Sequence, residues 1–373
     1  MKVRRAAMLG MLAACLTGGG PADAAQPAAM PRYDHIFVIV AENKGFDQMI
    51  RHPDWTPNLQ RLAAQYGEAT QFYAEAHPSE PNYIAMVGGD TFGIGDDDAF
   101  FCKSGPKREF CEGSERPGYV DHTIHAPSLA DQLTARHLTW KGYFEDLPAA
   151  GSLMPRWPTK TYPADGKPSA LYAAKHNGFV NFAHVQDAPY AERMQEFVNF
   201  HQLDADLAAG TLPNYAQIVP NQCNDMHGMG NGNGPGVPPD CNEARDPTGL
   251  IRRGDAEIGM LVDKIMASPV WREAGNTAIV VTFDENDGDE RNSAPQGCCG
   301  YDPGSTANFG GGQILTIVVT NHGPGHISDP TPYNHYSLLR TTEAAFGIDE
   351  YLGHAADEAK GVVTMSPLFA VKR

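Results

Sequence analysis

The chain reads TAIVVTF at residues 277–283, an uncharged run that ends directly at Asp284 and Glu285. A continuous run of this kind is typical of a strand that is buried on both faces of a parallel sheet. Similar runs predict further strands at 33–40, 139–144, 214–219 and 313–320. Helices are predicted between them by apolar spacing or capping signals, at 56–66, from 79, from 128, at 253–266 and from 335. This alternation predicts an α/β fold with one doubly wound, mostly parallel sheet. Residues 150–180 carry Pro, Gly and Lys and are expected to form a surface excursion.

Polar side chains follow three of these predicted strands. Glu42 and Asn43 follow the strand at 33–40, Asp225 and His227 follow 214–219, and Asp284 and Glu285 follow 277–283. Because parallel strands end at a shared edge of a sheet, these side chains are expected to lie together. Carboxylate, amide and imidazole groups bind divalent metal ions, so a metal site is the favoured interpretation. The simpler alternatives are a turn at Asn43 with a solvated Glu42, and a solvated acidic turn after residue 283.

The stretch HPSEPNYIAMVGG at residues 77–89 places Ser79 just ahead of a predicted helix. Pro81 suits the first turn of a helix, so Ser79 lies at or next to the N-cap. There the hydroxyl meets free N–H groups and the positive helix end, which favours phosphate and lowers the cost of an alkoxide. Taken alone, the motif fits an ordinary N-cap serine better than a nucleophile, and the carboxylates expected nearby shift the balance. His335, ahead of another predicted helix, is a structural histidine unless other ligands converge on it.

Four motifs follow one another along the chain: ENKGFD at 42–47, HPSEPNY at 77–83, FDE at 283–285 and HYSLLRT at 335–341. In this order they resemble the signatures of the bacterial and fungal phosphoesterase family, which contains acid phosphatases and phospholipases C and is related to the alkaline phosphatase superfamily. The resemblance covers residues 34–348. It implies a three-layer α/β/α sandwich with a mostly parallel central sheet, alkaline phosphatase-like, in a single domain over residues 31–370 with loop insertions.

The resemblance also implies roles for the site residues. Ser79 is implied as the nucleophile, passing through a phosphoserine intermediate. One divalent metal ion is implied to be held by Glu42, Asn43, Ser79, Asp284 and Glu285. A second ion, or the phosphate itself, is implied to contact Asp225, His227 and His335, and a further phosphate-binding side chain is Asn82. Oxygen ligands around Ser79 suit calcium, magnesium or manganese, while the histidines leave zinc or iron open for a second site.

The resulting expectation is an exported, metal-dependent hydrolase of phosphate esters. An acid phosphatase acting on monoesters is favoured, because the short chain and the HPSEPNY form resemble that branch of the family. A phospholipase C acting on lipid diesters is the alternative, although Asn286 and Asp287 stand where many relatives of that branch have histidine and glycine. A non-catalytic, exported metal-binding protein is a third hypothesis. The absence of a G-x-S-x-G motif around Ser79 and of a G-x-x-x-x-G-K-S/T motif disfavours an acyl esterase and a nucleotide triphosphatase.

The formal charge of −17 at pH 7 bears on the partners of the chain. An acidic surface repels nucleic-acid backbones and anionic membranes, so nucleic acid is not an expected partner. A small-molecule or lipid phosphate ester would need a local positive centre, which again points to bound metal. Asp96, Asp97 and Asp98 could bind a cation, but an acidic run is more often a solvated surface.

The first residues read as an export signal. A basic start and an apolar stretch at 6–16 precede the cleavage motif ADA at 22–24, which predicts a signal peptide over residues 1–24. The alternative is a lipobox-like LAAC at 12–15, in which Cys15 becomes a lipid anchor. No apolar run is long enough for a transmembrane helix. The protein is therefore expected in the periplasm or outside the cell, or alternatively as a membrane-anchored lipoprotein.

Six of the seven cysteines follow the predicted leader. An even number in an oxidising compartment suggests disulfides. The local pairs Cys102–Cys111 and Cys223–Cys241 each bracket a loop-like segment and are the expected bonds. The Cys298–Cys299 pair would then be a vicinal disulfide or two free thiols.

Overall fold

The computed structural model describes residues 30–97, 121–158, 170–229, 238–273, 275–287, 296–300 and 310–371. Several predictions fall outside this part of the chain and are not addressed by it. They are the signal peptide at 1–24, the alternative anchor at Cys15, the Cys102–Cys111 bond and the last residue of the acidic run, Asp98.

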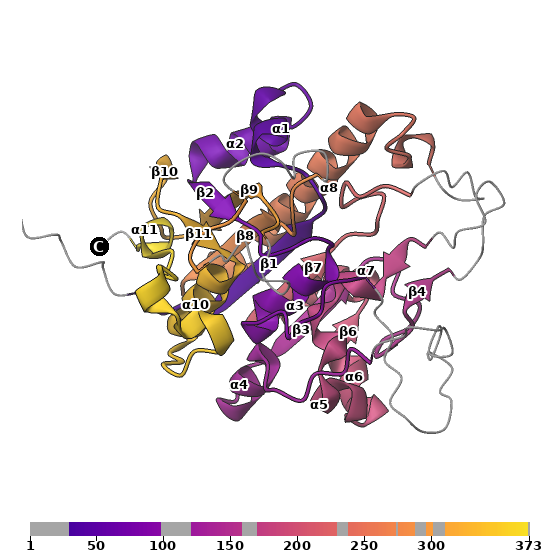
Figure 1. Ribbon diagram of the computed structural model, residues 1–373, viewed down its shortest axis with the longest axis vertical. Helices are drawn as coiled ribbons and strands as arrows, with labels where there is room; N and C mark the ends of the chain where they lie inside the picture. The colour runs from indigo at the N-terminus through magenta and orange to yellow at the C-terminus, as the bar shows by residue number, and fades with distance from the viewer. Residues whose placement is uncertain are drawn as a thin grey trace, which may run out of the picture.

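A nine-stranded sheet forms the centre of the molecule, with helices on both sides of it (Figure 1). The strand order is β10-β2-β9-β8-β1-β7-β3-β6, with β11 paired to β2. The bounds are β1 His35–Ala41, β2 Gly67–Tyr73, β3 Trp140–Phe144, β6 Phe197–Val198, β7 Tyr215–Val219, β8 Thr277–Phe283, β9 Gln313–Thr320, β10 Ile327–Asp329 and β11 Tyr333–Asn334. Strands β8, β1, β7, β3 and β6 are parallel, while β9 is antiparallel to both β8 and β2. The predicted α/β sandwich with a mostly parallel sheet is confirmed.

Strands β1 and β8 form the core of the sheet, because their side chains are buried on both faces. Every residue of β8 is buried, as are six of the seven residues of β1. Their register places Ile36 opposite Ala278 and Val38 opposite Val280. Burial of an aliphatic side chain of this size contributes roughly 1.5 to 3 kcal/mol. The two apolar runs that predicted parallel strands therefore lie at the centre of the fold.

The helices lie in two layers. Their bounds are α1 Phe46–Arg51, α2 Pro57–Gln65, α3 Glu80–Gly88, α4 Leu129–Ala135, α5 Ala183–Asp187, α6 Tyr190–Glu196, α7 Phe200–Ala209, α8 Pro247–Ala267, α9 Pro269–Glu273, α10 His335–Phe346 and α11 Ser366–Phe369. Helix α2 packs against α8, and α3 packs against α10. Figure 1 shows the first pair toward the top of the view and α3, α4 and α10 toward the bottom, on the other side of β1. Within the described ranges, no helix has both the length and the apolar character needed to cross a membrane.

The prediction of a surface excursion over residues 150–180 is wrong for residues 174–180, which pack against α3. A two-stranded sheet, β4 (Arg156–Trp157) with β5 (Tyr172–Ala173), leads into two short 3-10 helices, η1 (Ala174–His176) and η2 (Gly178–Asn181). Both pack against α3, and all of η2 is buried. A Cβ at residue 178 would lie 2.1 Å from the Tyr83 carbonyl oxygen, so only glycine allows this approach. Glycine in this segment suggested a loop, but Gly178 allows the close packing of η2 against α3.

Two disulfides are present among the described residues. Cys223–Cys241 ties the loop after β7 to the 3-10 helix η3 (Pro239–Cys241), which confirms the predicted bond. Cys298 and Cys299 form a vicinal disulfide rather than two free thiols. The loop after β7 is thus covalently fixed at the point where it carries predicted site residues.

Candidate active site

The carboxyl ends of three neighbouring strands bring the predicted site residues together. Strands β8, β1 and β7 lie side by side, and their ends continue into the loops that carry Asp284, Glu42 and Asp225. Backbone hydrogen bonds join these loops. The Asp284 N–H donates to the Ala41 carbonyl at 3.0 Å, and the Glu42 N–H donates to the Asp225 carbonyl at 2.8 Å. The shared edge expected from the sequence therefore exists.

The Ser79 hydroxyl makes no capping bond to helix α3, although Ser79 occupies the N-cap position. It donates instead to Oε2 of Glu42 at 3.0 Å, and it also lies 3.3 Å from Oε1 of Glu285. A hydroxyl has one proton, so it can serve only one of these two acceptors. The side chain is only 1% exposed. The simpler interpretation, that the Ser79 hydroxyl caps helix α3, is therefore not supported.

Asn43 combines the two roles considered for it. Its backbone adopts φ 42°, a left-handed conformation that asparagine tolerates, and so turns the chain after β1. Its side-chain amide donates to Oε1 of Glu285 at 2.6 Å and lies 3.4 Å from the Ser79 hydroxyl. Its N–H donates to Oδ1 of Asp284 at 3.0 Å. The turn therefore places an amide next to the serine.

Four carboxylates around Ser79 are buried, and few donors reach them. Glu42, Asp225 and Asp284 are fully buried, and Glu285 is 3% exposed. Among the described residues, no hydrogen bond reaches Oε1 of Glu42, Oδ2 of Asp225 or Oδ2 of Asp284. Burial, followed by the charge of Glu285, raises the pKa of Asp284 to about 7. Burial also raises the pKa of Glu42 and of Asp225, with the charge of Asp284 as a further cause.

Such a cluster is stable in its ionised form only beside a cation. Oxygen atoms that accept no hydrogen bond, in a ring that includes an amide and a hydroxyl, are the donor set of a divalent metal site. The residues present therefore fit the metal ion that the sequence predicts. His77, two residues ahead of Ser79 and not predicted as a site residue, contacts Oε2 of Glu285 through Nδ1 and so orients this carboxylate.

His176 reaches the site from η1, and no sequence pattern singled it out. Its Nε2 lies 3.3 Å from Oε1 of Glu42, and its Nδ1 lies 3.5 Å from Oδ2 of Asp225. The ring stacks on Tyr83 with 5.3 Å between centroids. His176 thus lies between the carboxylates that follow β1 and β7.

Lys175 adds a positive charge beside these histidines. Its Nζ donates to Oδ2 of Asp97 at 2.9 Å and lies 3.4 Å from Nε2 of His227. Burial alone would lower its pKa, but the charges of Asp97 and Glu42 outweigh burial and raise it. Burial, followed by the charge of Lys175, lowers the pKa of His227 to about 3 and also lowers that of His176. Both imidazoles are neutral near pH 7, the form that binds metal, and one ligand atom each from Glu42, His176 and His227 lies within 4.8 Å of the others.

A comparison with protein families shows which family the chain belongs to. The model of the Phosphoesterase family matches residues 51–349. The chain belongs to the phosphoesterase family. It is a hydrolase that acts on phosphoric ester bonds, and the hypothesis of a non-catalytic binding protein is set aside. The match begins after Glu42 and Asn43, so the inclusion of these two residues rests on the contacts described above.

Individual relatives of this phosphoesterase are phosphatases by name. It is 28% identical to the phosphatidylinositol-3-phosphatase of Mycobacterium tuberculosis, with 92% of this chain and 89% of that protein covered. It is 27% identical to the phosphate-repressible acid phosphatase of Penicillium chrysogenum, with 87% and 64% covered. It is 30% identical to a probable acid phosphatase of Kluyveromyces lactis, with 87% and 61% covered. The chain thus spans most of the mycobacterial protein but less than two thirds of these fungal ones.

A solved structure shares the fold. A Vibrio parahaemolyticus protein of the alkaline phosphatase superfamily superposes with a TM-score of 0.50 at 13% identity, covering 86% of this chain and 68% of that one. At this identity the likeness concerns the fold alone. The expected alkaline phosphatase-like architecture is confirmed.

Two predicted residues of the phosphoesterase site lie differently from the rest. His335 places Nε2 2.8 Å from the Asp284 carbonyl oxygen, and its N–H donates to Glu75, so it supports the loop after β8. Within the described residues, no contact joins it to Asp225 or His227. Asn82 is fully buried, and within the described part of the chain its amide bonds only the backbone of residues 75–78. This geometry assigns Asn82 to shaping the turn ahead of Ser79, and contact with phosphate stays a prediction for both residues.

Proposed function

We propose that this phosphoesterase is an exported, divalent-metal-dependent phosphatase that hydrolyses phosphate monoesters through a phosphoserine at Ser79. The observation that carries the proposal is the Ser79 hydroxyl, which makes no capping bond and donates to Glu42 inside a ring of buried carboxylates. The phosphatase names of the mycobacterial and fungal relatives support a monoester substrate. A phospholipase C acting on diesters is the alternative that the experiment below separates.

The residues that would hold the metal form two sets. One divalent ion, of calcium, magnesium or manganese type, would be held by Glu42, Asn43, Ser79, Asp284 and Glu285. A second ion, for which zinc and iron are also suited, or a phosphate oxygen would contact Asp225, His176 and His227. When bound, the metal polarises the phosphate and stabilises the Ser79 alkoxide.

The residues of this chain supply the proton transfer and the positioning. Oγ of Ser79 attacks phosphorus, and its proton passes toward Oε2 of Glu42, which lies 3.0 Å away. A new bond forms between Oγ and phosphorus as the bond from phosphorus to the ester oxygen breaks, and the leaving alcohol takes up a proton from solvent. Lys175 is placed to neutralise a phosphate oxygen, because its ammonium lies beside His227. Water then attacks the phosphoserine, which releases inorganic phosphate and restores the Ser79 hydroxyl.

Export is part of the proposal. The Cys223–Cys241 and Cys298–Cys299 bonds support an oxidising compartment, because disulfides are rare in reducing ones. A periplasmic or secreted protein is favoured, with a lipid anchor at Cys15 as the alternative. Fractionation of cells that express the full chain, with a Cys15→Ser variant as control, tests this. A protein that stays in the cytoplasm contradicts it.

The test of the activity is release of the aryl alcohol from matched aryl phosphate monoesters and diesters by chelated protein, with and without added divalent metal. Metal-dependent release from monoesters, lost in Ser79→Ala, is the expected result. Faster release from diesters assigns the phospholipase C branch instead. Undiminished turnover by Ser79→Ala, in protein free of contaminating phosphatase, contradicts the nucleophile.

A further inference from the structure

A second group of ionisable side chains lies beside the first turn of α3. It consists of Glu80, Asp96 and His122, which offer one ligand atom each within 4.8 Å of one another. Glu80 directly follows Ser79, but its side chain contacts Asn181 and His122 instead of the carboxylates around the serine. This group, called the Glu80 cluster below, shares no residue with the site proposed around Ser79.

The side chain of His122 joins the two carboxylates of the Glu80 cluster. Nδ1 of His122 lies 3.3 Å from Oε1 of Glu80, and Nε2 lies 3.1 Å from Oδ1 of Asp96. An imidazole between two carboxylates brings three potential metal ligands to one place.

Burial gives a second, independent observation. The Glu80 and His122 side chains are 1% and 2% exposed, whereas the Asp96 side chain is 50% exposed. Oε1 of Glu80 accepts from Asn181 at 2.6 Å, but Oε2, which is also buried, accepts no hydrogen bond among the described residues. A buried carboxylate oxygen without a donor costs stability unless a cation meets it. Asp96 opens the cluster to solvent, so an ion can enter from that side.

We propose that Glu80, Asp96 and His122 bind a divalent cation of the zinc or manganese type, at a site distinct from the one at Ser79. Two carboxylates and one imidazole are a donor set that suits these ions, and solvent on the Asp96 side completes the coordination with water. The acidic run at 96–98 was interpreted as a solvated surface, and the proposal makes its first residue, Asp96, a metal ligand.

A chain of hydrogen bonds connects the Glu80 cluster to the site proposed around Ser79. The Glu80 N–H donates to Oδ1 of Asp97 at 3.1 Å, and Oδ2 of Asp97 accepts from Lys175 at 2.9 Å. Lys175 in turn contacts His227. An ion that holds Asp96 against Glu80 therefore also fixes the neighbouring Asp97, and through it the ammonium of Lys175. The expected role of this cation is to position Lys175 rather than to contact substrate.

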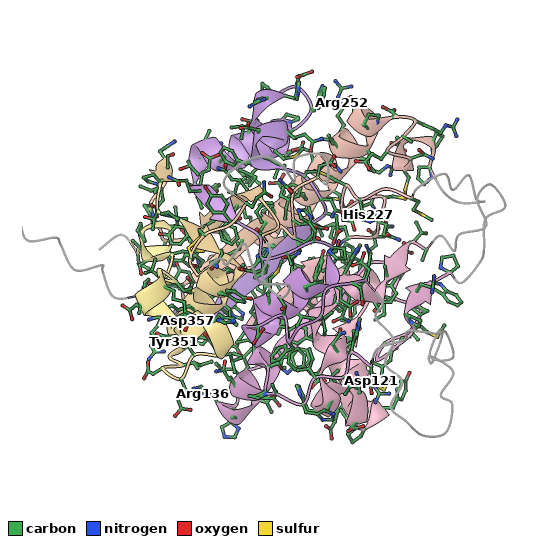
Figure 2. The ribbon with its side chains drawn as sticks, viewed as in Figure 1. Asp121, Arg136, His227, Arg252, Tyr351 and Asp357 are labelled. Atoms are coloured by element: carbon green, nitrogen blue, oxygen red, sulfur yellow. A yellow bond between two sulfur atoms is a disulfide. The ribbon has the colours of Figure 1, made fainter. Side chains whose placement is uncertain are left out.

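The test counts metal ions per chain. Full-length protein is stripped with a chelator, loaded with Zn²⁺ or Mn²⁺ and freed of excess metal, and its metal content is measured by elemental mass spectrometry. The variant is Asp96→Ala, whose half-exposed side chain can be removed without opening the core. The matched control is Asp121→Ala, an exposed aspartate next to His122 in sequence that lies at the lower rim of the molecule in Figure 2.

Both variants are compared in the natural chain and in an Asp284→Asn background, which removes a ligand of the proposed site at Ser79. Asp96→Ala is expected to bind one ion fewer per chain than Asp121→Ala in either background. Equal metal content and equal affinity in the two variants overturn the proposal. A loss of metal in Asp284→Asn reports on the site at Ser79 alone, so failure of one site is distinguished from failure of the other.

Discussion

Two serines in this protein precede helices in much the same way, and they have different surroundings. Ser128 precedes α4 with an extended backbone (φ −121°, ψ 176°), and its N–H and its hydroxyl lie 2.7 Å and 3.3 Å from Oδ2 of Asp131, in the first turn of that helix. Ser79 precedes α3 with a helical backbone (φ −58°, ψ −48°) and makes no capping bond. Its hydroxyl donates to Glu42 instead.

This difference supports the proposal that Ser79 takes part in catalysis, whereas Ser128 stabilises a helix. Both residues are buried, and both stand where a helix begins, so position alone does not distinguish them. The partners do, because Ser128 is tied to its own helix while Ser79 faces carboxylates from strands β1 and β8. The contact of the Ser79 hydroxyl with Glu42 supports the proposal that Ser79 is a nucleophile.

The largest expected effect is on catalysis by Ser79→Ala. Loss of the attacking oxygen is expected to lower kcat by roughly 10⁴-fold or more. The unfolding free energy is expected to fall by roughly 1 to 3 kcal/mol, because the buried Glu42 loses a hydrogen-bond donor. Steady-state kinetics and urea unfolding measure the two effects. A variant that loses stability and keeps turnover would make Ser79 equivalent to Ser128 and break the comparison.

Substitution of Lys175 by glutamine should have the next largest effect. If its ammonium binds a phosphate oxygen, kcat/KM is expected to fall roughly 100-fold. The matched control is Lys141→Gln, since Lys141 is paired with Asp206 away from the site. Equal kcat/KM in the two variants would show that Lys175 does not bind the phosphate of the substrate.

The carboxylates that surround Ser79 should make metal-free protein sensitive to pH. The pKa of Asp284 is raised to about 7, so the protonated carboxyl favours the folded state. This contribution is fully present below the unfolded pKa, near 4, and is lost as the pH rises through about 7. The contribution of Asp284 is expected to fall by roughly 2 to 4 kcal/mol over this range. The buried His176 and His227, whose pKa values are lowered, act in the opposite direction, so this contribution is read as the difference between metal-free natural protein and its Asp284→Asn variant.

Denaturant unfolding at several pH values measures this loss. Added divalent metal and the Asp284→Asn substitution should each reduce it, because each compensates or removes the buried charge. The same dependence on pH between 4 and 7 in metal-free natural protein and in Asp284→Asn would contradict the raised pKa of Asp284.

Ser128→Ala should give the smallest effect. Loss of an N-cap serine is expected to cost about 1 kcal/mol of unfolding free energy with unchanged kcat/KM. The same unfolding and kinetic assays used for Ser79→Ala apply. A large loss of activity in Ser128→Ala would show that capping serines affect catalysis indirectly, and would weaken the inference drawn from Ser79.

The sheet was predictable where burial leaves a continuous apolar run. Strands β1 and β8 are of this kind, and the polar residues at their ends were therefore found with them. Strand β2 was missed because its sequence, GEATQFY, has polar side chains at partly exposed positions. Its extended form comes from pairing with β9, a contact between residues distant in sequence.

The part of the site carried by strand ends was predictable for the same reason, and the part carried by η1 was not. Lys175 and His176 follow no long strand, and they reach the site because Gly178 lets this segment lie on α3. The sequence of 150–180 does not reveal that packing. The side chains of Asn82 and His335 were found as part of matching motifs, but their hydrogen bonds depend on backbone positions that motifs do not specify.

The most direct test of the account is to trap the phosphorylated enzyme. Metal-loaded protein is mixed with a phosphate monoester, quenched in acid within the first turnovers, digested and analysed by mass spectrometry. The account predicts a phosphoryl group on the peptide that contains Ser79 and none on the peptide that contains Ser128. Rapid turnover with Ser79 unmodified at every quench time, together with full activity of Ser79→Ala, would contradict it.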